Sequence, residues 1–476
     1  MSDEMTTLMD ESATRLTTML RSGEVSALEV MNAVYDRMDA CNARLMAVVN
    51  PLSREEALSL ARAADEVPLP ERGVLHGLPM ACKDAVEVRG FPTTFGFAPF
   101  ANNFARSDDP MAARLRSAGA LFIGKTNMPE FGLGSNSFNP LFGQTVNPYD
   151  LGKTAGGSSG GAAAGLAARI FPLADGSDMG GSLRNPASFC NVVGLRTTPG
   201  RLPQTRSLDW FARLGVSGPM ARTVEDTALL LSVQAGPSGA DPLALPESGE
   251  AFRAPLEAPM AGRRIAFSPD LGGLPIAKAT AAVIDSAPAV FESLGCQVER
   301  AEPDLTGAMD VFQIQRAAVL SVLGRQLDTA VPSWRDHAKD TVIWNIEKGF
   351  ALTAEELIQS ELRRSEIYRD AVEFFERFDA LILPAAQVPP FDISHEWIEE
   401  IEGQRMETYI DWMRVCCMTT VTGLPSISVP AGFTPAGLPV GLQIVGPPRG
   451  ELELLRIAHA FESATQHWRQ KPPDFA

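Results

Sequence analysis

The segment from Thr154 to Cys190 restricts the fold of this chain more than any other part of the sequence. It reads TAGGSSGGAAAGLAARIFPLADGSDMGGSLRNPASFC, with a cluster of glycine and serine on either side of a short helical stretch. Glycine permits backbone conformations closed to other residues and lets a ligand approach main-chain N–H groups closely. The stretch at 160–171 is too short, and through Arg169 too charged, to span about 30 Å of bilayer, so we expect a buried helix.

Short β-rich runs alternate with helical stretches ahead of this segment. Residues 78–83 and 120–125 are apolar runs of strand length, and residues 110–119 have the spacing of a helix. Two further helices are predicted between residues 11 and 49, with a break at residues 24–26. This alternation is typical of a layered α/β protein whose sheet is largely buried.

The second half of the chain repeats the pattern after a stretch rich in Pro, Gly and Ala at residues 236–261. The predicted elements are a strand at 263–268, a helix at 277–294, a strand at 296–300, paired strands at 426–433 and 437–446, and a helix at 451–465. We expect the first three of these elements to form an accessory lobe over the same sheet.

The charge of the chain argues against two classes of partner. Its 41 Lys and Arg against 58 Asp and Glu give a net charge of −17, which repels nucleic-acid phosphates and anionic membranes, so we expect neither as a partner. The acidic residues 1–12 have no pattern of a secretion signal. The six cysteines lack a CxxC pair or metal-finger spacing, which predicts reduced thiols in a cytoplasm and no metal site.

Asp178 and Arg184 bracket the second Gly/Ser cluster, six positions apart. An ion pair between them would hold the loop in one shape, although a surface pair would have the same spacing. The run DMGGS at residues 178–182 brings several main-chain N–H groups together, as an oxyanion hole requires. The loop is therefore a candidate for serine catalysis, and a simple tight turn is the alternative.

A serine nucleophile needs a base, and the obvious type is histidine. The chain has five: His76, His337, His395, His459 and His467. Their contexts favour structural or solvated roles, so a Ser/His/Asp triad stays possible without support. Lys83 is the better candidate, because it ends the apolar run at 78–82 and burial lowers a lysine pKa until the amine accepts a serine proton. A solvated lysine at a strand end is the alternative.

Two motif matches compete with this interpretation. Residues 119–126 satisfy the phosphate-binding formula GxxxxGKT, but residues 120–123 are an apolar strand rather than a flexible cradle, so we predict a buried strand. Residues 157–161 satisfy GxSxG, which would make Ser159 the nucleophile of an α/β-hydrolase. That interpretation needs a later acid and histidine and leaves the DMGGS run without a role.

Seven segments occur in a diagnostic order. They are LHGLPMACKDAVEVRGFPTTFG, GKTNMPEFGLGSNSFNPLFGQTVNP, GGSSGG, GSDMGGSLRNPASFCNVVGLRTTPGR, GPMARTVED, GLPSISVPAGF and GLPVGLQIVGPP. With them the chain resembles the amidase signature family, least diagnostically at residues 250–375. The resemblance implies an α/β amidase signature fold, with a large mixed β-sheet core covered by helices on both faces. It also implies one domain over 1–476, with an N-terminal helical layer (1–70), a signature core (71–233), an accessory lobe (234–400) and C-terminal strands and helix that return to the core (401–476).

The resemblance also implies roles for the motif residues. Ser182 is the nucleophile, Ser158 bridges it to Lys83, and Lys83 is the base. The main-chain N–H groups of Met179, Gly180, Gly181 and Ser182 form the oxyanion hole, Ser159, Asp178 and Arg184 support the site, and the bridging serine has a cis peptide. Lys83 takes a proton through Ser158 while Ser182 attacks a carbonyl, and water then hydrolyses the acyl-serine without a metal or organic cofactor.

The predicted activity is hydrolysis of a small or aryl amide, with carbamates (urethanes) and esters possible because they form similar intermediates. One alternative is the glutaminase (A) subunit of a glutamyl-tRNA amidotransferase, which Asp411 and Arg414 keep open, although YIDWMRVCCMTTVTGLP looks more like independent amidases. Another is a catalytically silent binding subunit, which the complete triad disfavours. We expect specificity to depend on residues 128–138, residues 207–214, Phe312, Trp334 and Trp344. A homodimer is a family-level expectation.

Overall fold

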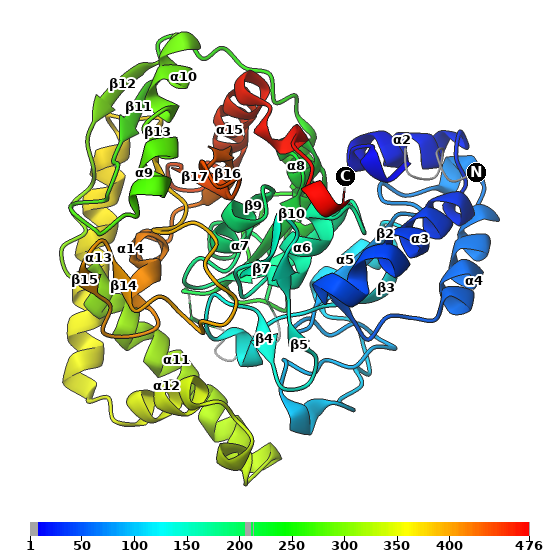
Figure 1. Cartoon of the computed structure of the whole chain (residues 1–476), viewed down its shortest axis with the longest axis horizontal. Helices are drawn as coiled ribbons and strands as arrows, with labels where there is room; N and C mark the ends of the chain where they lie inside the picture. The colour runs from blue at the N-terminus through cyan, green and yellow to red at the C-terminus, as the bar shows by residue number, and fades with distance from the viewer. Residues whose placement is uncertain (1–7, 205–210, 213, 476) are drawn as a thin grey trace.

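A mixed sheet of eleven strands runs through the protein (Figure 1). The structure is a computed structural model that describes residues 8–204, 211–212 and 214–475. In sheet order the strands are β1 (Val48–Val49), β3 (Leu121–Thr126), β2 (Pro79–Lys83), β8 (Leu173–Asp178), β10 (Val216–Ala221), β9 (Val193–Arg196), β16 (Ser426–Phe433), β17 (Pro439–Val445), β13 (Ala380–Pro384), β11 (Arg264–Phe267) and β12 (Gln297–Arg300). Three short hairpins pair β4 (Phe138–Asn139) with β5 (Gly143–Gln144), β6 (Val146–Asn147) with β7 (Asp150–Thr154), and β14 (Glu400–Ile401) with β15 (Gln404–Arg405).

The sheet combines parallel and antiparallel pairs. Strand β2 runs parallel to β3 and β8, whereas β16 and β17 form the predicted antiparallel pair. At the other end, β11 runs parallel to both β12 and β13. The unit predicted over residues 263–300 therefore contributes two strands to the edge of the main sheet.

Helices cover both faces of the sheet, as the sequence predicts (Figure 1). They are α2 (Ala13–Ser22), α3 (Ala27–Leu45), α4 (Arg54–Asp65), α5 (Pro110–Ser117), α6 (Gly160–Ala167), α7 (Arg184–Phe189), α8 (Val224–Gln234), α9 (Lys278–Ile284), α10 (Ala287–Ser293), α11 (Ala308–Ala330), α12 (Asp340–Phe350), α13 (Ala354–Phe375), α14 (Arg414–Val421) and α15 (Glu451–Thr465). The two predicted N-terminal helices are α2 and α3. Gly23 ends α2 with a φ of 78°, and Ser26 caps α3 through Glu29, which explains the predicted break.

The prediction of one helix over residues 277–294 is wrong. The structure has two helices there, α9 and α10, separated at Asp285 and Ser286. Pro288 lies in the first turn of α10. Because proline has no backbone N–H, it cannot donate to the carbonyl of Ile284, so a continuous helix would lose a hydrogen bond at this point.

The phosphate-loop match at residues 119–126 is a buried strand, as predicted. Strand β3 occupies residues 121–126, and the Lys125 side chain within it is fully buried. Its amine donates a hydrogen bond to the carbonyl of Val86 and is closed off from solvent. The resemblance to a nucleotide-binding motif is therefore accidental.

Close packing places the first Gly/Ser cluster against the sheet. Helix α6 begins at Gly160, and every residue in it is buried. A Cβ atom at Gly161 would lie 2.3 Å from the Asn127 nitrogen and 2.5 Å from the Ala47 oxygen. Glycine therefore lets the start of α6 rest directly on the backbone that follows β3. No helix among the described residues is long and apolar enough to cross a membrane.

We predict that Gly161→Ala lowers the stability of the fold by about 2 kcal/mol or more, because the new methyl group clashes with main-chain atoms that cannot rotate away. Gly239→Ala is the matched control, since its Cβ would meet nothing within 4 Å. Denaturant unfolding of both variants measures the difference. Equal stability of the two variants would show that α6 can shift to make room.

Candidate active site

Lys83 ends strand β2 with a side chain that is 1% exposed. Its amine nitrogen lies 2.7 Å from Ser158 Oγ, 2.9 Å from Ser159 Oγ and 2.9 Å from Ser177 Oγ. Its backbone N–H donates to the Asp175 carboxylate at 3.0 Å, which fixes the end of the strand. The amine thus meets three hydroxyl groups and no ion-pair partner within 4 Å among the described residues.

Burial lowers the pKa of Lys83 to about 7, and the negative charges of Asp175 and Asp178 oppose this shift only in part. A charged ammonium would donate to all three serines. A neutral amine keeps a lone pair and accepts a proton from one of them. The site therefore holds a lysine that can act as a base near neutral pH.

Ser158 lies at the bottom of the site, where it is 2% exposed. The peptide bond between Gly157 and Ser158 is cis, as the resemblance implies. Ser135 Oγ donates to the Gly157 carbonyl at 2.6 Å, and a Cβ at Gly132 would lie 3.3 Å from Ser158 Oγ. The segment 128–138, predicted to shape specificity, thus packs directly against the bridging serine.

Ser182 lies in the loop between β8 and α7 and is partly exposed, whereas Ser159 is fully buried. The Ser159 N–H donates to the Ser182 carbonyl at 3.3 Å, so the two Gly/Ser clusters meet in space. Of these two serines, only Ser182 is open to a substrate. This difference in exposure argues against Ser159 as the nucleophile of a GxSxG elbow.

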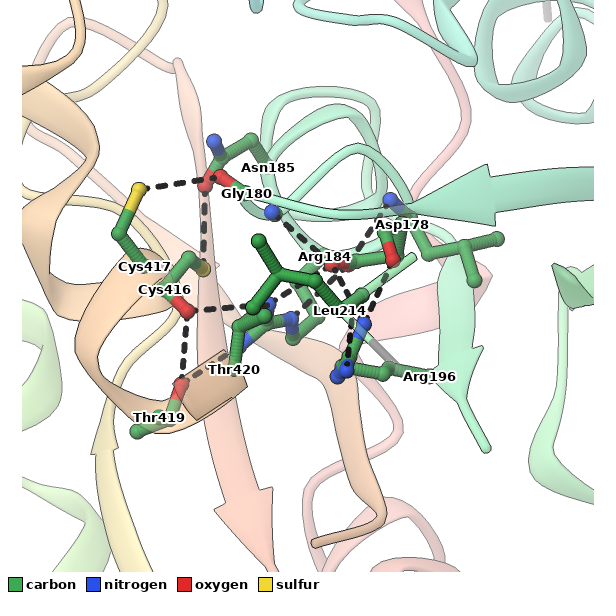
Figure 2. A network of polar contacts seen from close by, with 12 residues as sticks. Asp178, Gly180, Arg184, Asn185, Arg196, Leu214, Cys416, Cys417, Thr419 and Thr420 are labelled. Atoms are coloured by element: carbon green, nitrogen blue, oxygen red, sulfur yellow. Dashed lines mark hydrogen bonds and ion pairs between the residues drawn. The ribbon is translucent and has the colours of Figure 1, made fainter. Parts of the chain in front are cut away.

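The Asp178 carboxylate holds the loop in shape (Figure 2). It accepts the Gly181 N–H at 3.0 Å and the Leu183 N–H at 3.2 Å, so the chain wraps around it. Arg184 donates to both of its oxygens, at 2.9 and 3.0 Å, and both side chains are completely buried. The predicted ion pair is therefore present, and it is a core pair rather than a surface pair.

A second arginine and a C-terminal helix complete this network. Arg196 donates to the Asp178 main-chain carbonyl at 2.5 Å and to the Leu214 carbonyl at 2.9 Å. The remaining partners of Arg184 are Thr419 Oγ1, Thr420 Oγ1, Gln443 Oε1 and the Cys416 carbonyl, at 2.6–3.2 Å. Burial alone would raise the pKa of Asp178, but Arg184 and then Arg196 hold it well below its usual range.

The loop leaves some main-chain N–H groups for a ligand. The Gly181 N–H is taken by Asp178, whereas in the described part of the chain those of Met179, Gly180 and Ser182 have no hydrogen-bond partner. Gly181 has a φ of 105°, and a Cβ there would lie 2.7 Å from the Cys416 Cβ. A side chain at this position would distort the turn that aims these amides.

Three groups at the site are not predicted from the sequence: Asp175, Ser177 and Arg196. Asp175 and Ser177 lie two residues apart on β8, on the side that faces Lys83. Strand alternation places them on one face, but only the pairing of β2 with β8 brings Lys83 to them. Arg196 lies at the end of β9, and no local pattern indicates that it reaches Asp178.

The other predicted pocket residues differ in their surroundings. Phe312 on α11 lies against the loop that carries Ser182, since a Cβ at Gly180 would be 3.1 Å from its ring. Trp344 is 38% exposed and contacts Tyr409 edge to face. Trp334 is 0% exposed within a hydrophobic cluster, so it is a core residue. Most of the predicted segment 207–214 lies outside the described residues.

None of the five histidines forms a hydrogen bond with Ser158, Ser159 or Ser182 among the described residues. In the same part of the chain, no group of three or more His, Cys, Asp or Glu side chains is placed to hold a metal ion. Lysine and serine are therefore the groups that the site offers for proton transfer.

The mixed sheet, with a buried lysine beside glycine-flanked serines, agrees with the family resemblance of the sequence. A profile of the family described as Amidase matches residues 29–455. The chain belongs to this family, as its sequence segments predict, and it is a hydrolase that acts on amides.

Individual relatives agree with this assignment over nearly the whole chain. The chain is 36% identical to an acylamidase of Rhodococcus erythropolis, with 97% of each chain covered. It is 32% identical to the (A) subunit of the glutamyl-tRNA(Gln) amidotransferase of Chromohalobacter salexigens, with 98% of this chain and 99% of the relative covered. The structure of a bacterial aryl acylamidase superposes with a TM-score of 0.88 and 27% identity, covering 96% of this chain and 97% of that one.

We predict that Arg184→Met destabilises the protein by about 3 kcal/mol or more, because it leaves the buried Asp178 carboxylate short of a countercharge. Arg15→Met is the control, since its ion pair with Glu24 is exposed and is worth at most about 1 kcal/mol. Denaturant unfolding measures both. If Arg184→Met were no more harmful than Arg15→Met, the pair would not hold the loop.

Proposed function

We propose that the protein hydrolyses amides through an acyl-enzyme on Ser182, with Ser158 and Lys83 as the proton relay. The observation that carries the proposal is the fully buried Lys83 amine, 2.7 Å from Ser158 Oγ, together with a partly exposed Ser182 whose carbonyl accepts the neighbouring Ser159 N–H. A neutral amine in this position takes the Ser158 proton while Ser158 takes the proton of Ser182. The Ser182 oxygen is then able to attack a substrate carbonyl.

The oxyanion formed in this attack is stabilised by main-chain N–H groups. We assign this role to Met179, Gly180 and Ser182, whose amides are free for a ligand among the described residues. The Gly181 amide, which the resemblance also implies, donates to Asp178 and shapes the turn instead. Because Asp178 and Arg184 are fully buried, the donors stay fixed during the reaction, which is the condition for electrostatic stabilisation of a transition state.

The two half-reactions use the same groups in opposite directions. In acylation, the proton taken by Lys83 returns through Ser158 to the leaving nitrogen, so the C–N bond breaks with departure of a neutral amine. In deacylation, water gives a proton to the same relay and attacks the acyl-serine, and Ser182 leaves with that proton. The products are a carboxylic acid and an amine.

We propose a small or aryl amide as the substrate. The acylamidase and aryl acylamidase relatives support this class, and esters and carbamates fit the same chemistry. A glutaminase needs groups for a zwitterionic amino acid, and Asp411 and Arg414 are the residues that could supply them. Here they pair with each other at 2.9 Å, and Asp411 also accepts the Thr408 N–H at 2.7 Å. This engagement favours the amidase over the glutaminase subunit.

We further infer that the chain forms one domain over residues 1–476 and acts in a cytoplasm. Strands from residues 48 to 445 share one sheet, which supports a single unit. All six cysteines are free and buried, which suits a reducing compartment. A homodimer is the assembly that we propose, and sedimentation analysis of the purified protein tests it directly.

We predict that Ser182→Ala lowers turnover at least about 10³-fold on the preferred member of a substrate panel. The panel contains an anilide, an aliphatic primary amide, an aryl carbamate, an ester and free glutamine, and we expect the anilide to be preferred. Ser159→Ala is the comparison variant, and its acyl-enzyme should still carry the acyl group on the Ser182 peptide in mass spectrometry. Wild-type turnover by Ser182→Ala would refute the assigned nucleophile, and a preference for glutamine would favour the amidotransferase subunit.

We predict that kcat/KM for the preferred amide falls as the pH decreases through about 7. The pKa of Lys83 is lowered to about 7, so below this pH the amine carries a proton and cannot act as the base. Each further pH unit should then reduce kcat/KM about tenfold. Lys83→Arg, which stays charged, should be inactive at every pH tested. A flat profile from pH 5 to 9 would contradict the assignment of Lys83 as the base.

A further inference from the structure

A second cavity lies apart from the Lys83 site, at the far end of α14. It has a volume of about 580 Å³ and lies among α13, the end of α14, the segment after β9 and the loop that follows β17. Its lining includes three arginines, Arg364 and Arg369 on α13 and Arg449 on the loop. No residue of the proton relay proposed above lines this cavity.

The three guanidinium groups have no ion-pair partner in the part of the chain that the structure describes. Among the described residues none of them has a carboxylate within 4 Å, and the contact made by Arg364 is a long one, 3.4 Å to the Val421 carbonyl. Glu361 also lines the cavity, but it accepts a hydrogen bond from Gln315 at 2.7 Å. Three positive groups against one negative group give the cavity a positive potential in a chain whose net charge is −17.

A neighbour on the same helix provides a contrast. Arg363, next to Arg364, pairs with Glu366 at 2.9 Å and donates to the Thr306 carbonyl. Arg364 is half-buried, and burial lowers its pKa, while the negative charge of Glu361, which is not in contact with it, opposes this shift only in part. A partly desolvated guanidinium with no carboxylate in contact is a group that gains from binding an anion.

The rest of the lining suits an organic molecule rather than a bare inorganic ion. Apolar side chains come from Pro199, Leu243, Leu245, Leu424 and Pro448, and Tyr368 adds an aromatic ring. Thr198 is also in the lining, although its hydroxyl oxygen is buried and has no hydrogen-bond partner among the described residues. The cavity therefore offers charge for a headgroup and apolar surface for a body.

We propose that this cavity binds a small organic anion, with a carboxylate or phosphate headgroup on Arg364, Arg369 and Arg449 and an apolar body against the leucines and Tyr368. Carboxylate and phosphate groups bind arginine in the same way, because each has two oxygens that accept parallel N–H hydrogen bonds from one guanidinium group. The bound anion would contact both elements that hold the Arg184 network. Thr198 follows Arg196 by two residues, and Val421 ends the helix that carries Thr419 and Thr420.

Calorimetric titration of the full-length protein tests the proposal with benzoate and phenyl phosphate as probes and benzyl alcohol as the neutral analogue. We expect one saturable site for at least one anion, with a Kd of about 1 mM or below, and no such site for the alcohol. The tighter anion identifies the headgroup. The melting temperature should rise with the concentration of the bound anion, as ligand linkage requires.

The variant Arg369→Gln/Arg449→Gln should weaken anion binding at least about tenfold. Both side chains are exposed, so the unliganded variant should keep the folded state of the wild type. Arg363→Gln is the matched control, because it removes a charge from the same helix outside the cavity, and it should bind as the wild type does. The proposal fails if neither anion binds saturably, if benzyl alcohol binds equally well, or if the double variant binds like the wild type.

Discussion

The active site depends on one carboxylate. The Asp178 carboxylate accepts hydrogen bonds from two main-chain N–H groups of the loop that carries Ser182. It also accepts hydrogen bonds from Arg184 and Arg196 (Figure 2). Burying a carboxylate without partners has a large free-energy cost. The hydrogen bonds from the loop and the arginines offset this cost. The same contacts aim the remaining amides outward. The contacts that balance the buried charge of Asp178 are thus the same contacts that fix the conformation of the Ser182 loop.

Lys83 is also buried, but its amine, unlike the Asp178 carboxylate, has no oppositely charged group in contact with it among the described residues. Its amine is as deeply buried as Asp178, but it meets hydroxyl groups instead of a countercharge, so the neutral form is favoured. The two buried groups lie on neighbouring strands and play different parts because of these partners. The fold keeps Asp178 charged for structure and leaves Lys83 able to gain and lose a proton for chemistry.

The sequence predicts the elements near the site better than their contacts. Strands β2, β3, β16 and β17 are close to the predicted ranges, because their apolar runs are bounded by clear turn residues. Of the motif residues, Lys83 and Ser158 meet at 2.7 Å, and the loop that follows Asp178 meets the first Gly/Ser cluster through the Ser159 N–H and the Ser182 carbonyl. The predicted helix over 277–294 is too long, since Pro288 at its middle restarts the helix rather than continuing it. Arg196 and Gln443 could not be predicted, because they reach Asp178 and Arg184 through strand order, which no local pattern encodes.

Arg184 contacts residues that are far away in the sequence, and this has a consequence for folding during synthesis. Two of its partners, Thr419 and Gln443, lie 235 and 259 residues further along the chain. When the loop with Ser182 leaves the ribosome, the groups that hold its arginine have yet to be made. Contacts of such sequence separation form late in folding. A nascent chain that stops before β17 therefore lacks Gln443, one of the groups that hold Arg184 and with it the Ser182 loop, so this loop reaches its final shape only after the C-terminal strands have joined the sheet.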